Sequence, residues 1–302
     1  MITASAPGKI IILGEHTALY GNPVLVAAVG LRARATVSAG NGVNVKAPGI
    51  DAPAKRMELG LAMSKKAVEL TGGGGFDITV SSDIPLASGM GSSASIASAL
   101  AAALRAEKNL PFDKKVIAET AWKCEDVVHT KSSGVDPFAA TYGGIMVYTR
   151  GSIVELKIKT VPEIVISHTG ITSDTGEIVK YVDSKRESNF NSFEDFLKSS
   201  KALVLEGKEA VENFDMKRLG RLMNENHKLL SGLGVSCEEL ESLVKAARGA
   251  GAYGAKLCGA GKGGIMVALT NQKTKTDVSK ALSKAGGKII QTQISKDGVR
   301  LE

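Results

Sequence analysis

A strand, a glycine turn and a helix of small residues follow one another between residues 76 and 108, and this order constrains the fold most strongly. The run DIPLASGMGSSAS at 83–95 joins the alternating stretch FDITVSS to the helical stretch ASIASALAAALRAEKN. Gly89 and Gly91 permit backbone angles that other residues avoid, and Ser92 and Ser93 open the helix. Free N–H groups and hydroxyls at the positive end of a helix suit an anion, so a phosphate is the first candidate ligand.

Two glycine loops compete for this role, because both match the G-x-G-x-x-G/A fingerprint of dinucleotide-binding proteins. The matches are Gly89-Gly91-Ala94 and Gly259-Gly261-Gly264. That fold needs a strand, a loop, a helix and then a further strand ending in an acidic residue. After the first match one helix leads into another, and the second match joins two strands. Lys262 is followed by glycine, which excludes a Walker A loop. Taken alone, either loop fits a tight turn as well as a phosphate site.

The order of predicted elements indicates an α+β protein. The first half mixes strands such as KIIILGE, PVLVAAV and RARATVSA with helices at about 55–71, 92–108 and 113–129. Near residue 160 the pattern restarts with the strand EIVISHT, four helices, two strands, a helix and a last strand. This is the outline of an α+β sandwich with an antiparallel sheet. We predict domains at 1–160 and 161–302, packed tightly because no long linker divides them.

Charge, cysteines and hydropathy exclude several classes of protein. The net charge of +7 is mild, and the lysines are scattered without interleaved aromatics, which argues against nucleic-acid binding. Three widely spaced cysteines argue against a disulfide framework or a zinc ribbon. No apolar run approaches the ~20 residues that span a bilayer, and the N-terminus lacks a signal-peptide pattern. We expect a cytoplasmic protein with no membrane partner.

Polar residues outside the glycine loops are the remaining candidates for chemistry. Lys9, Glu15 and His16 bracket the apolar run IIILG near the N-terminus. Glu125 stands in a helical pattern, and Asp136 follows eleven residues later in GVDP, which predicts a glycine-bounded turn. In isolation, a strand lysine is more often solvated than catalytic, and an acid in such a turn is more often a cap.

Three motifs in order, however, carry a resemblance to a known superfamily. PGKIIILGEH, PLASGMGSSAS and KLCGAGKGG resemble the three motifs of the GHMP kinases, which include galactokinase, homoserine kinase, mevalonate kinase and phosphomevalonate kinase. The chain is most similar to the mevalonate kinases, because SAPGK…GEH…YGNP resembles that family's opening. In addition, the acidic pair of Glu125 and Asp136, which ends in SGVD, resembles the acidic pair of that family. Galactokinases have an aspartate where Ala18 stands, and homoserine kinases lack GEH. The resemblance covers essentially the whole chain.

This resemblance implies a fold and a reaction. The fold is an N-terminal α/β domain with a left-handed βαβ phosphate-loop region, a C-terminal ferredoxin-like α+β sandwich, and an active site in the cleft between them. The reaction is ATP-dependent phosphorylation of the 5-hydroxyl of (R)-mevalonate, giving 5-phosphomevalonate and ADP on the route to isopentenyl diphosphate. Another GHMP small-molecule kinase and a non-catalytic nucleotide-binding relative are the alternatives. The resemblance also implies a homodimer.

The resemblance assigns ATP, Mg²⁺ and the catalytic step to particular residues. Residues expected to bind ATP are Ser82, Ala87, Ser88, Gly89, Met90, Gly91, Ser92 and Ser93. Mg²⁺ would be held by Ser93 and Glu125, with Ser92 as the alternative hydroxyl. Asp136 would be the catalytic base, with Lys9 beside it to keep the acid ionised and lower the pKa of the alcohol.

The substrate-binding residues follow from the same motifs. They are Glu15, His16, Thr175, Gly259, Ala260 and Gly261. The family usually has glycine where Lys262 stands, and we expect the Lys262 side chain to point to solvent.

Overall fold

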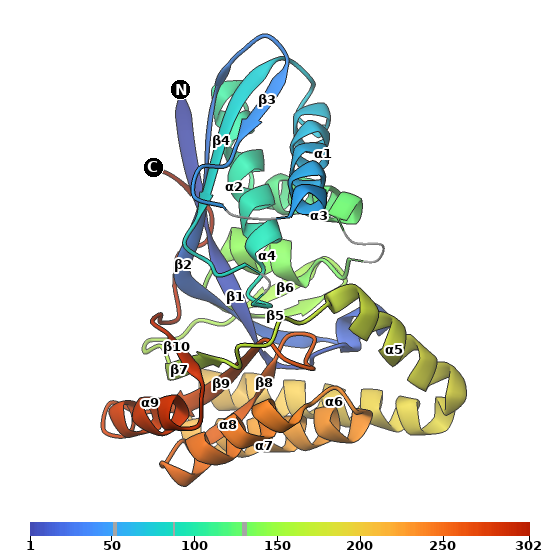
Figure 1. The fold of residues 1–302 in the computed structure, drawn as a ribbon, viewed down its shortest axis with the longest axis vertical. Helices are drawn as coiled ribbons and strands as arrows, with labels where there is room; N and C mark the ends of the chain where they lie inside the picture. The colour runs from blue at the N-terminus through green and yellow to red at the C-terminus, as the bar shows by residue number, and fades with distance from the viewer. Residues whose placement is uncertain (51–52, 87, 129–131) are drawn as a thin grey trace.

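The computed structural model of the chain describes residues 1–50, 53–86, 88–128 and 132–302. These residues form two β-sheets, each covered by helices, which follow one another along the long axis of the molecule (Figure 1). The α+β class predicted from the sequence is therefore confirmed.

The first sheet is built around one long antiparallel hairpin. Its strands are β1 (Ile2–Leu13), β2 (Val24–Ala39), β3 (Val43–Lys46), β4 (Phe76–Ser82), β5 (Ile145–Thr149), β6 (Ser152–Glu155) and β11 (Arg300–Leu301). The order is β11-β1-β2-β4-β3, and β5 pairs with the other end of β2 and with β6. The stretches PVLVAAV and RARATVSA, predicted as two strands, form the single strand β2, since Gly30 between them continues the extended chain.

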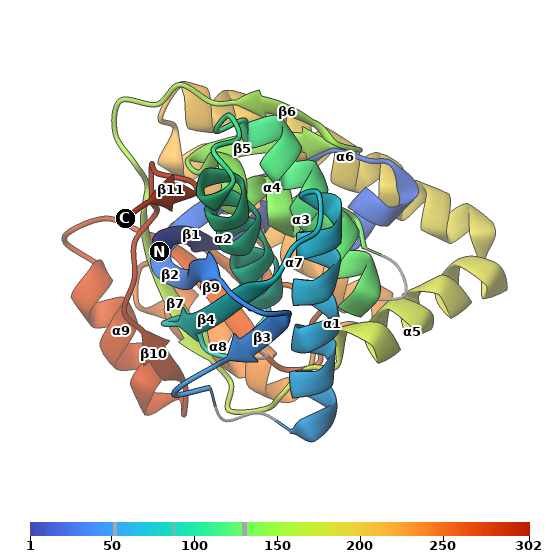
Figure 2. The ribbon, with the colours of Figure 1, turned by 90° about the horizontal axis from the view of Figure 1, so that it is seen from above.

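Four helices cover one face of this sheet (Figure 2). They are α1 (Ala54–Leu70), α2 (Ser92–Glu107), α3 (Lys114–Val128) and α4 (Val135–Tyr142). The buried face of α2 consists mostly of alanine and serine, which lets the helix approach β1 and β2 closely. A short 3₁₀ helix, η1 (Thr17–Tyr20), connects β1 to β2.

The second sheet is antiparallel, in the order β10-β7-β9-β8. Its strands are β7 (Glu163–His168), β8 (Gly254–Cys258), β9 (Ile265–Thr270) and β10 (Lys288–Ile290). The helices of this half are α5 (Thr175–Ser188), α6 (Phe190–Glu212), α7 (Met216–Leu233), α8 (Glu238–Gly249) and α9 (Lys275–Lys284). Helices α6 to α9 lie beneath the strands, and α5 extends to one side of them (Figure 1).

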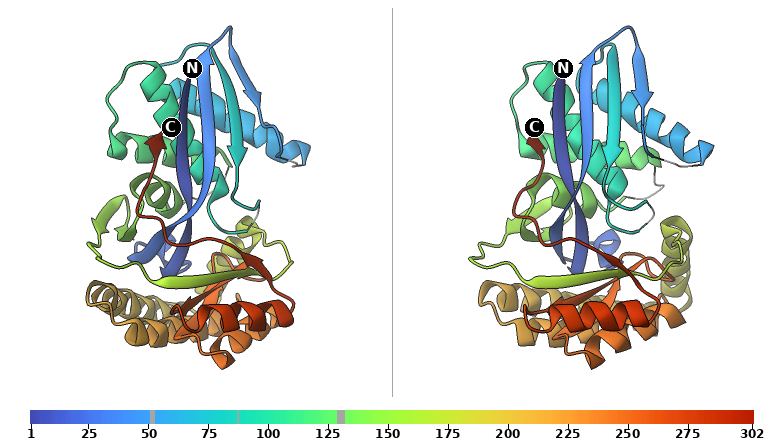
Figure 3. Two further views of the ribbon diagram at one scale, coloured as in Figure 1. Left: turned by 90° about the vertical axis from the view of Figure 1, so that its left-hand side faces the viewer. Right: turned by 60° about the vertical axis from the view of Figure 1, so that its left-hand side comes forward.

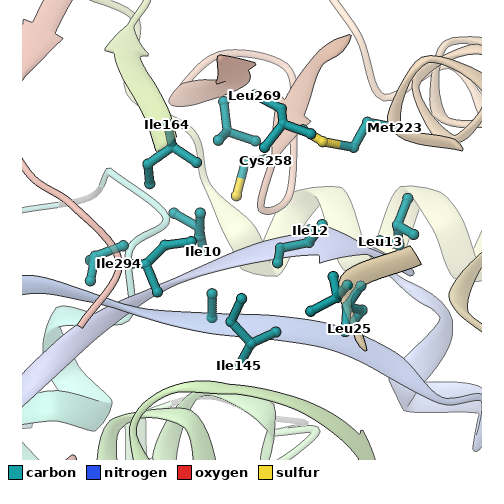
Figure 4. Close-up of a cluster of buried hydrophobic side chains, with 14 of the residues drawn as sticks. Ile10, Ile12, Leu13, Leu25, Ile145, Ile164, Met223, Cys258, Leu269 and Ile294 are labelled. Atoms are coloured by element: carbon teal, nitrogen blue, oxygen red, sulfur yellow. The ribbon is translucent and has the colours of Figure 1, made fainter. Parts of the chain in front are cut away.

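The two halves share a hydrophobic core (Figure 4). Ile10 and Ile12 of β1 are buried together with Ile164 of β7, Leu269 of β9 and Met223 of α7. The tight packing expected from the absence of a linker is therefore observed. This shared core fixes the position of one half relative to the other.

The end of the chain returns to the first sheet. Val29 bridges Ile294, and β11 pairs with β1 at Ala4 and Leu301. Figure 3 shows the C-terminal residues running along the sheet to end near the N-terminus. The domain boundary near residue 160 stays a prediction, and the last residues of the chain lie with its first half.

The turn predicted around Asp136 is instead the first turn of helix α4. Pro137 fits there because the first N–H groups of a helix have no intrahelical acceptor. Gly134, at φ 80°, precedes the helix as its N-cap residue. Within the described ranges, no helix combines the length and the apolar character needed to cross a membrane.

Candidate active site

The loop from β4 to α2 leaves the N-terminus of α2 without a side-chain cap. Gly91 is the N-cap residue at φ 74°, in the left-handed region, and Gly89 lies at φ 78°. No side chain caps this helix end, and no acidic residue occupies the first turn, whose residues all belong to the described part of the chain. Free N–H groups and the helix dipole therefore favour an anion at this point.

Two hydrogen bonds hold this loop, one to the first sheet and one within the loop itself. The backbone N–H of Lys9 donates to the Met90 carbonyl at 2.9 Å, and the Met90 side chain is buried. The Ser88 hydroxyl, also buried, donates to the Pro85 carbonyl at 2.7 Å. The Met90 carbonyl thus connects the loop to β1 next to Lys9.

Most residues expected to contact ATP lie together in this loop. Ser82 closes β4, and its hydroxyl lies 3.3 Å from that of Ser92. Ser92 and Ser93 form the start of α2. Ala87, also expected to bind ATP, lies outside the described residues.

Lys9 and Asp136 form an ion pair beside Gly91. The Lys9 Nζ lies 3.2 Å from Asp136 Oδ1, and it donates to the Gly89 carbonyl at 2.9 Å. A Cβ on residue 91 would lie 3.2 Å from Asp136 Oδ2 and 3.3 Å from Lys9 Cγ. Glycine at this position leaves room for the ion pair directly at the end of the helix.

The two members of this pair differ in their access to solvent. Burial acts to lower the pKa of Lys9, but the charge of Asp136 and the hydrogen bond to it act in the opposite direction, and the net pKa is raised. The side chain of Lys9 is 6% exposed and that of Asp136 is 29% exposed. The Asp136 carboxylate is therefore accessible to an incoming molecule, and the buried Lys9 cation lies beside it.

A second carboxylate, Glu125 of α3, points toward the start of α2. The Ser93 hydroxyl donates to its Oε1 at 2.9 Å, and the Ser132 hydroxyl donates to its Oε2 at 3.4 Å. Burial raises the pKa of Glu125, and the charge of Asp136 raises it further, to about 8. A raised pKa means that the ionised form of Glu125 lacks compensation, so a cation bound beside this carboxyl group would stabilise its charged form.

The glycine loop after β8 meets the phosphate loop backbone to backbone. A Cβ on Gly89 would lie 3.7 Å from the Cys258 carbonyl and 3.8 Å from the Cα of Gly259. A small cavity lies between the two loops and the start of α5. Its lining residues are Ser88, Gly89, Ser173, Thr175, Cys258, Ala260, Gly261, Gly263 and Gly264. Thr175, Ala260 and Gly261, expected to bind substrate, thus share a cavity with the phosphate loop.

His16 lies at the same glycine loop. Its backbone is in the left-handed region at φ 68°, and its Nε2 donates to the Ala260 carbonyl at 3.0 Å. Burial lowers the pKa of His16 to about 4. The imidazole is therefore neutral at pH 7, with its proton on Nε2, because a carbonyl can only accept.

Glu15 points away from this cavity into the protein. Its carboxylate accepts hydrogen bonds from Lys256 Nζ and, at 2.9 Å, from Asn226 Nδ2. The side chains of Lys256 and Glu15 are 0% and 1% exposed. The structure therefore brings His16 to the glycine loop after β8 but places the neighbouring carboxylate in a buried ion pair.

Comparison with known proteins agrees with this geometry. Residues 59–144 match the family described as GHMP kinases N terminal domain, and residues 208–288 match GHMP kinases C terminal. A mevalonate kinase of Pyrococcus abyssi is 37% identical over 331 positions, covering 100% of this chain and 98% of the relative. The chain belongs to the mevalonate kinase family. A mevalonate kinase of Thermococcus gammatolerans, 36% identical over 330 positions with the same coverage, supports this membership.

A solved member of the mevalonate kinase family has the same fold. The crystal structure of L. major mevalonate kinase in complex with R-mevalonate is similar at a TM-score of 0.86 and 28% identity, covering 97% of this chain and 96% of that one. The GHMP kinase fold and the phosphotransferase class expected from the three motifs are thereby confirmed.

Lys262, which departs from the pattern expected of mevalonate kinases, is exposed but not free in solvent. Its backbone takes φ 50°, and its N–H donates to the Val235 carbonyl at 2.7 Å. Its Nζ lies 3.7 Å from the centroid of the Tyr181 ring on α5. A cation–π contact thus connects the glycine loop to α5.

Sequence reasoning missed Lys256, Asn226 and Ser132, which hold the predicted site residues. Lys256 carried a signal, since it is a lysine within the motif KLCGAGKGG in an otherwise apolar strand. Asn226 and Ser132 carried none, because their partners Glu15 and Glu125 are brought to them by folding.

The residues at the start of α2 fit a magnesium nucleotide. Within the described part of the chain, no group of three or more His, Cys, Asp or Glu side chains could hold a metal ion. Mg²⁺ needs no such group, because it keeps several waters and binds one or two carboxylates together with substrate phosphates. The Ser93–Glu125 contact and the raised pKa of Glu125 suit a hard cation at this point.

Proposed function

We propose that this chain transfers the γ-phosphoryl group of ATP to the 5-hydroxyl of (R)-mevalonate, giving 5-phosphomevalonate and ADP. The observation that carries the proposal is the Lys9–Asp136 ion pair at the uncapped N-terminus of α2. A base and a cation there are adjacent to the expected site of the transferred phosphoryl group. The relatives named mevalonate kinase and the related structure named with R-mevalonate identify the acceptor.

Asp136 accepts the proton in this step. The 5-hydroxyl oxygen forms a bond to the γ-phosphorus, the bond from that phosphorus to the bridging oxygen of ADP breaks, and the hydroxyl proton passes to Asp136. Lys9 pairs with this carboxylate and would stabilise the developing negative charge near the acceptor oxygen. The backbone N–H groups of residues 89 to 93 bind the phosphates.

Ser93 and Glu125 would hold Mg²⁺. The ion supplies neutralisation of the phosphate charge when it is bound. Ser93 is favoured over Ser92, because its hydroxyl contacts Glu125 whereas that of Ser92 faces Ser82. Glu125 is buried close to Asp136, and a bound cation would offset the repulsion between the two carboxylates.

The acceptor would lie in the cavity between the two glycine loops. Thr175 at the start of α5 lines this space, as do Ala260 and Gly261. Neutral His16 orients the loop through Ala260. Direct contact between Glu15 and mevalonate stays a prediction, as do the homodimer and the cytoplasmic location.

A coupled ADP-release assay with four acceptors tests the proposal. Mevalonate should give turnover, whereas phosphomevalonate, galactose and homoserine should give little. The matched control is Asp136→Asn, which separates acceptor-dependent transfer from background ATP hydrolysis. Turnover with another acceptor and none with mevalonate would refute the proposed substrate, and no turnover with any would favour a non-catalytic nucleotide-binding protein.

A further inference from the structure

One turn of the chain connects both active-site carboxylates. Residues Ser132 to Gly134 lead directly into α4, where Asp136 occupies the first turn. The Ser132 hydroxyl donates to Glu125 Oε2 at 3.4 Å. A shift of this turn would therefore have two effects at once: it would move Asp136, and it would break the hydrogen bond from Ser132 to Glu125.

Two aromatic side chains donate hydrogen bonds to the backbone of the Ser132–Gly134 turn. The Tyr148 hydroxyl on β5 donates to the Ser133 carbonyl at 2.6 Å. The indole N–H of Trp122 on α3 donates to the Ser132 carbonyl at 3.2 Å. Two consecutive carbonyls are thus bound by rigid side chains from two different elements, a strand and a helix.

The packing around Gly134 shows how little freedom the turn has. A Cβ on Gly134 would lie 2.8 Å from the Trp122 ring and would collide with the Tyr148 hydroxyl. Gly134 also takes φ 80°, which side chains disfavour. Tyr148 is completely buried, and its ring centroid lies 5.3 Å from that of Phe138 on α4. The Tyr148 ring therefore contacts the helix that carries the base, while its hydroxyl fixes the preceding turn.

We propose that Tyr148 and Trp122 are positioning residues for phosphoryl transfer, which act by holding the Ser132–Gly134 turn and through it Asp136 and Glu125. This inference rests on the proposed function of the site. Neither aromatic residue lines the cavity between the glycine loops. Their loss therefore affects the chemical step and the magnesium requirement, and leaves acceptor binding largely intact.

Tyr148→Phe tests this directly, because it retains the ring and removes only the hydroxyl. The Ser133 carbonyl then loses its donor, and small displacements of a catalytic group are costly. We expect kcat to fall about tenfold, the Mg²⁺ concentration for half-maximal activity to rise, and the mevalonate KM to change less than about threefold. The matched control is Tyr142→Phe, whose ring stacks on the same Phe138 at 6.0 Å and whose hydroxyl has no hydrogen bond to the turn in the described part of the chain.

A second readout needs neither ATP nor mevalonate. Trp122 is the sole tryptophan of the chain, so its emission spectrum reports on the turn. Tyr148→Phe should shift the emission maximum, and Tyr142→Phe should not. The spectral shift persists even if mevalonate proves to be the wrong acceptor, so failure of the proposed function and failure of this inference are distinguishable.

Three results would overturn the inference. The first is wild-type kcat in Tyr148→Phe with an unchanged emission spectrum. The second is an equal loss of kcat in Tyr142→Phe, which would indicate general packing. If Tyr148→Phe fails to fold, Trp122→Phe replaces it as the test, because it removes the other hydrogen bond and leaves Tyr148 in place. The inference then requires kcat of Trp122→Phe to fall several-fold at a nearly constant mevalonate KM. Wild-type kcat in Trp122→Phe is the third result that would overturn the inference.

Discussion

Lys256→Met should destabilise the protein severely, because it leaves the carboxylate of Glu15 buried without its cation. The side chains of Lys256 and Glu15 are 0% and 1% exposed, so water cannot replace the lost charge. Asn226 still donates one hydrogen bond to Glu15, but a neutral amide does not neutralise a carboxylate. Breaking one partner of such a buried pair typically costs about 3–5 kcal/mol of unfolding free energy.

This cost translates into a measurable change of melting temperature. At about 2.1 cal/mol/K per residue, a chain of 302 residues has an unfolding entropy of about 0.63 kcal/mol/K. The midpoint of thermal unfolding should therefore fall by about 5–8 °C. Circular dichroism and urea titration measure the two quantities independently.

Two further variants isolate the effect of burial. Lys256→Met combined with Glu15→Gln should recover at least half of the lost stability, because the buried pair is then neutral on both sides. Lys275→Met removes a partly exposed ion pair to Glu163, at 2.7 Å, and should cost no more than about 1 kcal/mol.

The outcome also decides between two roles for Glu15. Suppose Lys256→Met cost less than about 1 kcal/mol, while Glu15→Gln left stability unchanged and raised the mevalonate KM. The reasoning from burial would then be refuted, and Glu15 would be the substrate contact predicted from the sequence.

Three other changes test the active site. Asp136→Asn should lower kcat by at least ~10² while the mevalonate KM changes less than about tenfold; retention of a tenth of the wild-type kcat in steady-state assays would contradict a base. Gly91→Ala forces a side chain into the left-handed region and to within 3.2 Å of Asp136 and 3.3 Å of Lys9, so kcat should fall about 10²-fold in the same assay. Glu125→Gln should raise the Mg²⁺ requirement and change the pH dependence of stability. Because the pKa of Glu125 is raised on folding to about 8, the wild-type protein without nucleotide pays a penalty that is absent below about pH 4 and grows up to pH 8. The stability of Glu125→Gln relative to wild type should therefore increase from pH 5 to pH 8 in urea titrations, and a constant difference would contradict the shift.

The sequence allowed most helices and most strands to be predicted, because their determinants are local. The alternation in FDITVSS predicted β4, and the run of small residues from Ser92 predicted α2. The phosphate loop was predictable for the same reason, since strand, glycines and helix are contiguous. Helix α4 was not predicted as a helix, because at eight residues, starting Val-Asp-Pro, it carries too short a pattern to be told from a turn.

The partners of the site residues depended on the tertiary structure. Ser92 and Ser93 are adjacent and chemically alike, and the rotation of α2 alone directs one hydroxyl to Ser82 and the other to Glu125. Glu15 and His16 are also neighbours, yet the left-handed backbone at His16 sends one side chain to the cavity loop and the other to Lys256.

The sequence by itself determined the family, the order of the elements and the types of residue available for phosphoryl transfer. It did so because the three motifs are short contiguous segments whose chemistry can be recognised without knowing what faces them. Only the tertiary structure decided the separation of 3.2 Å between Lys9 and Asp136, and the hold of Tyr148 on the turn before that base. Lys9 and Asp136 are 127 positions apart in the sequence, and their distance is set by the packing of α4 and the phosphate loop against β1, to which residues throughout the core contribute.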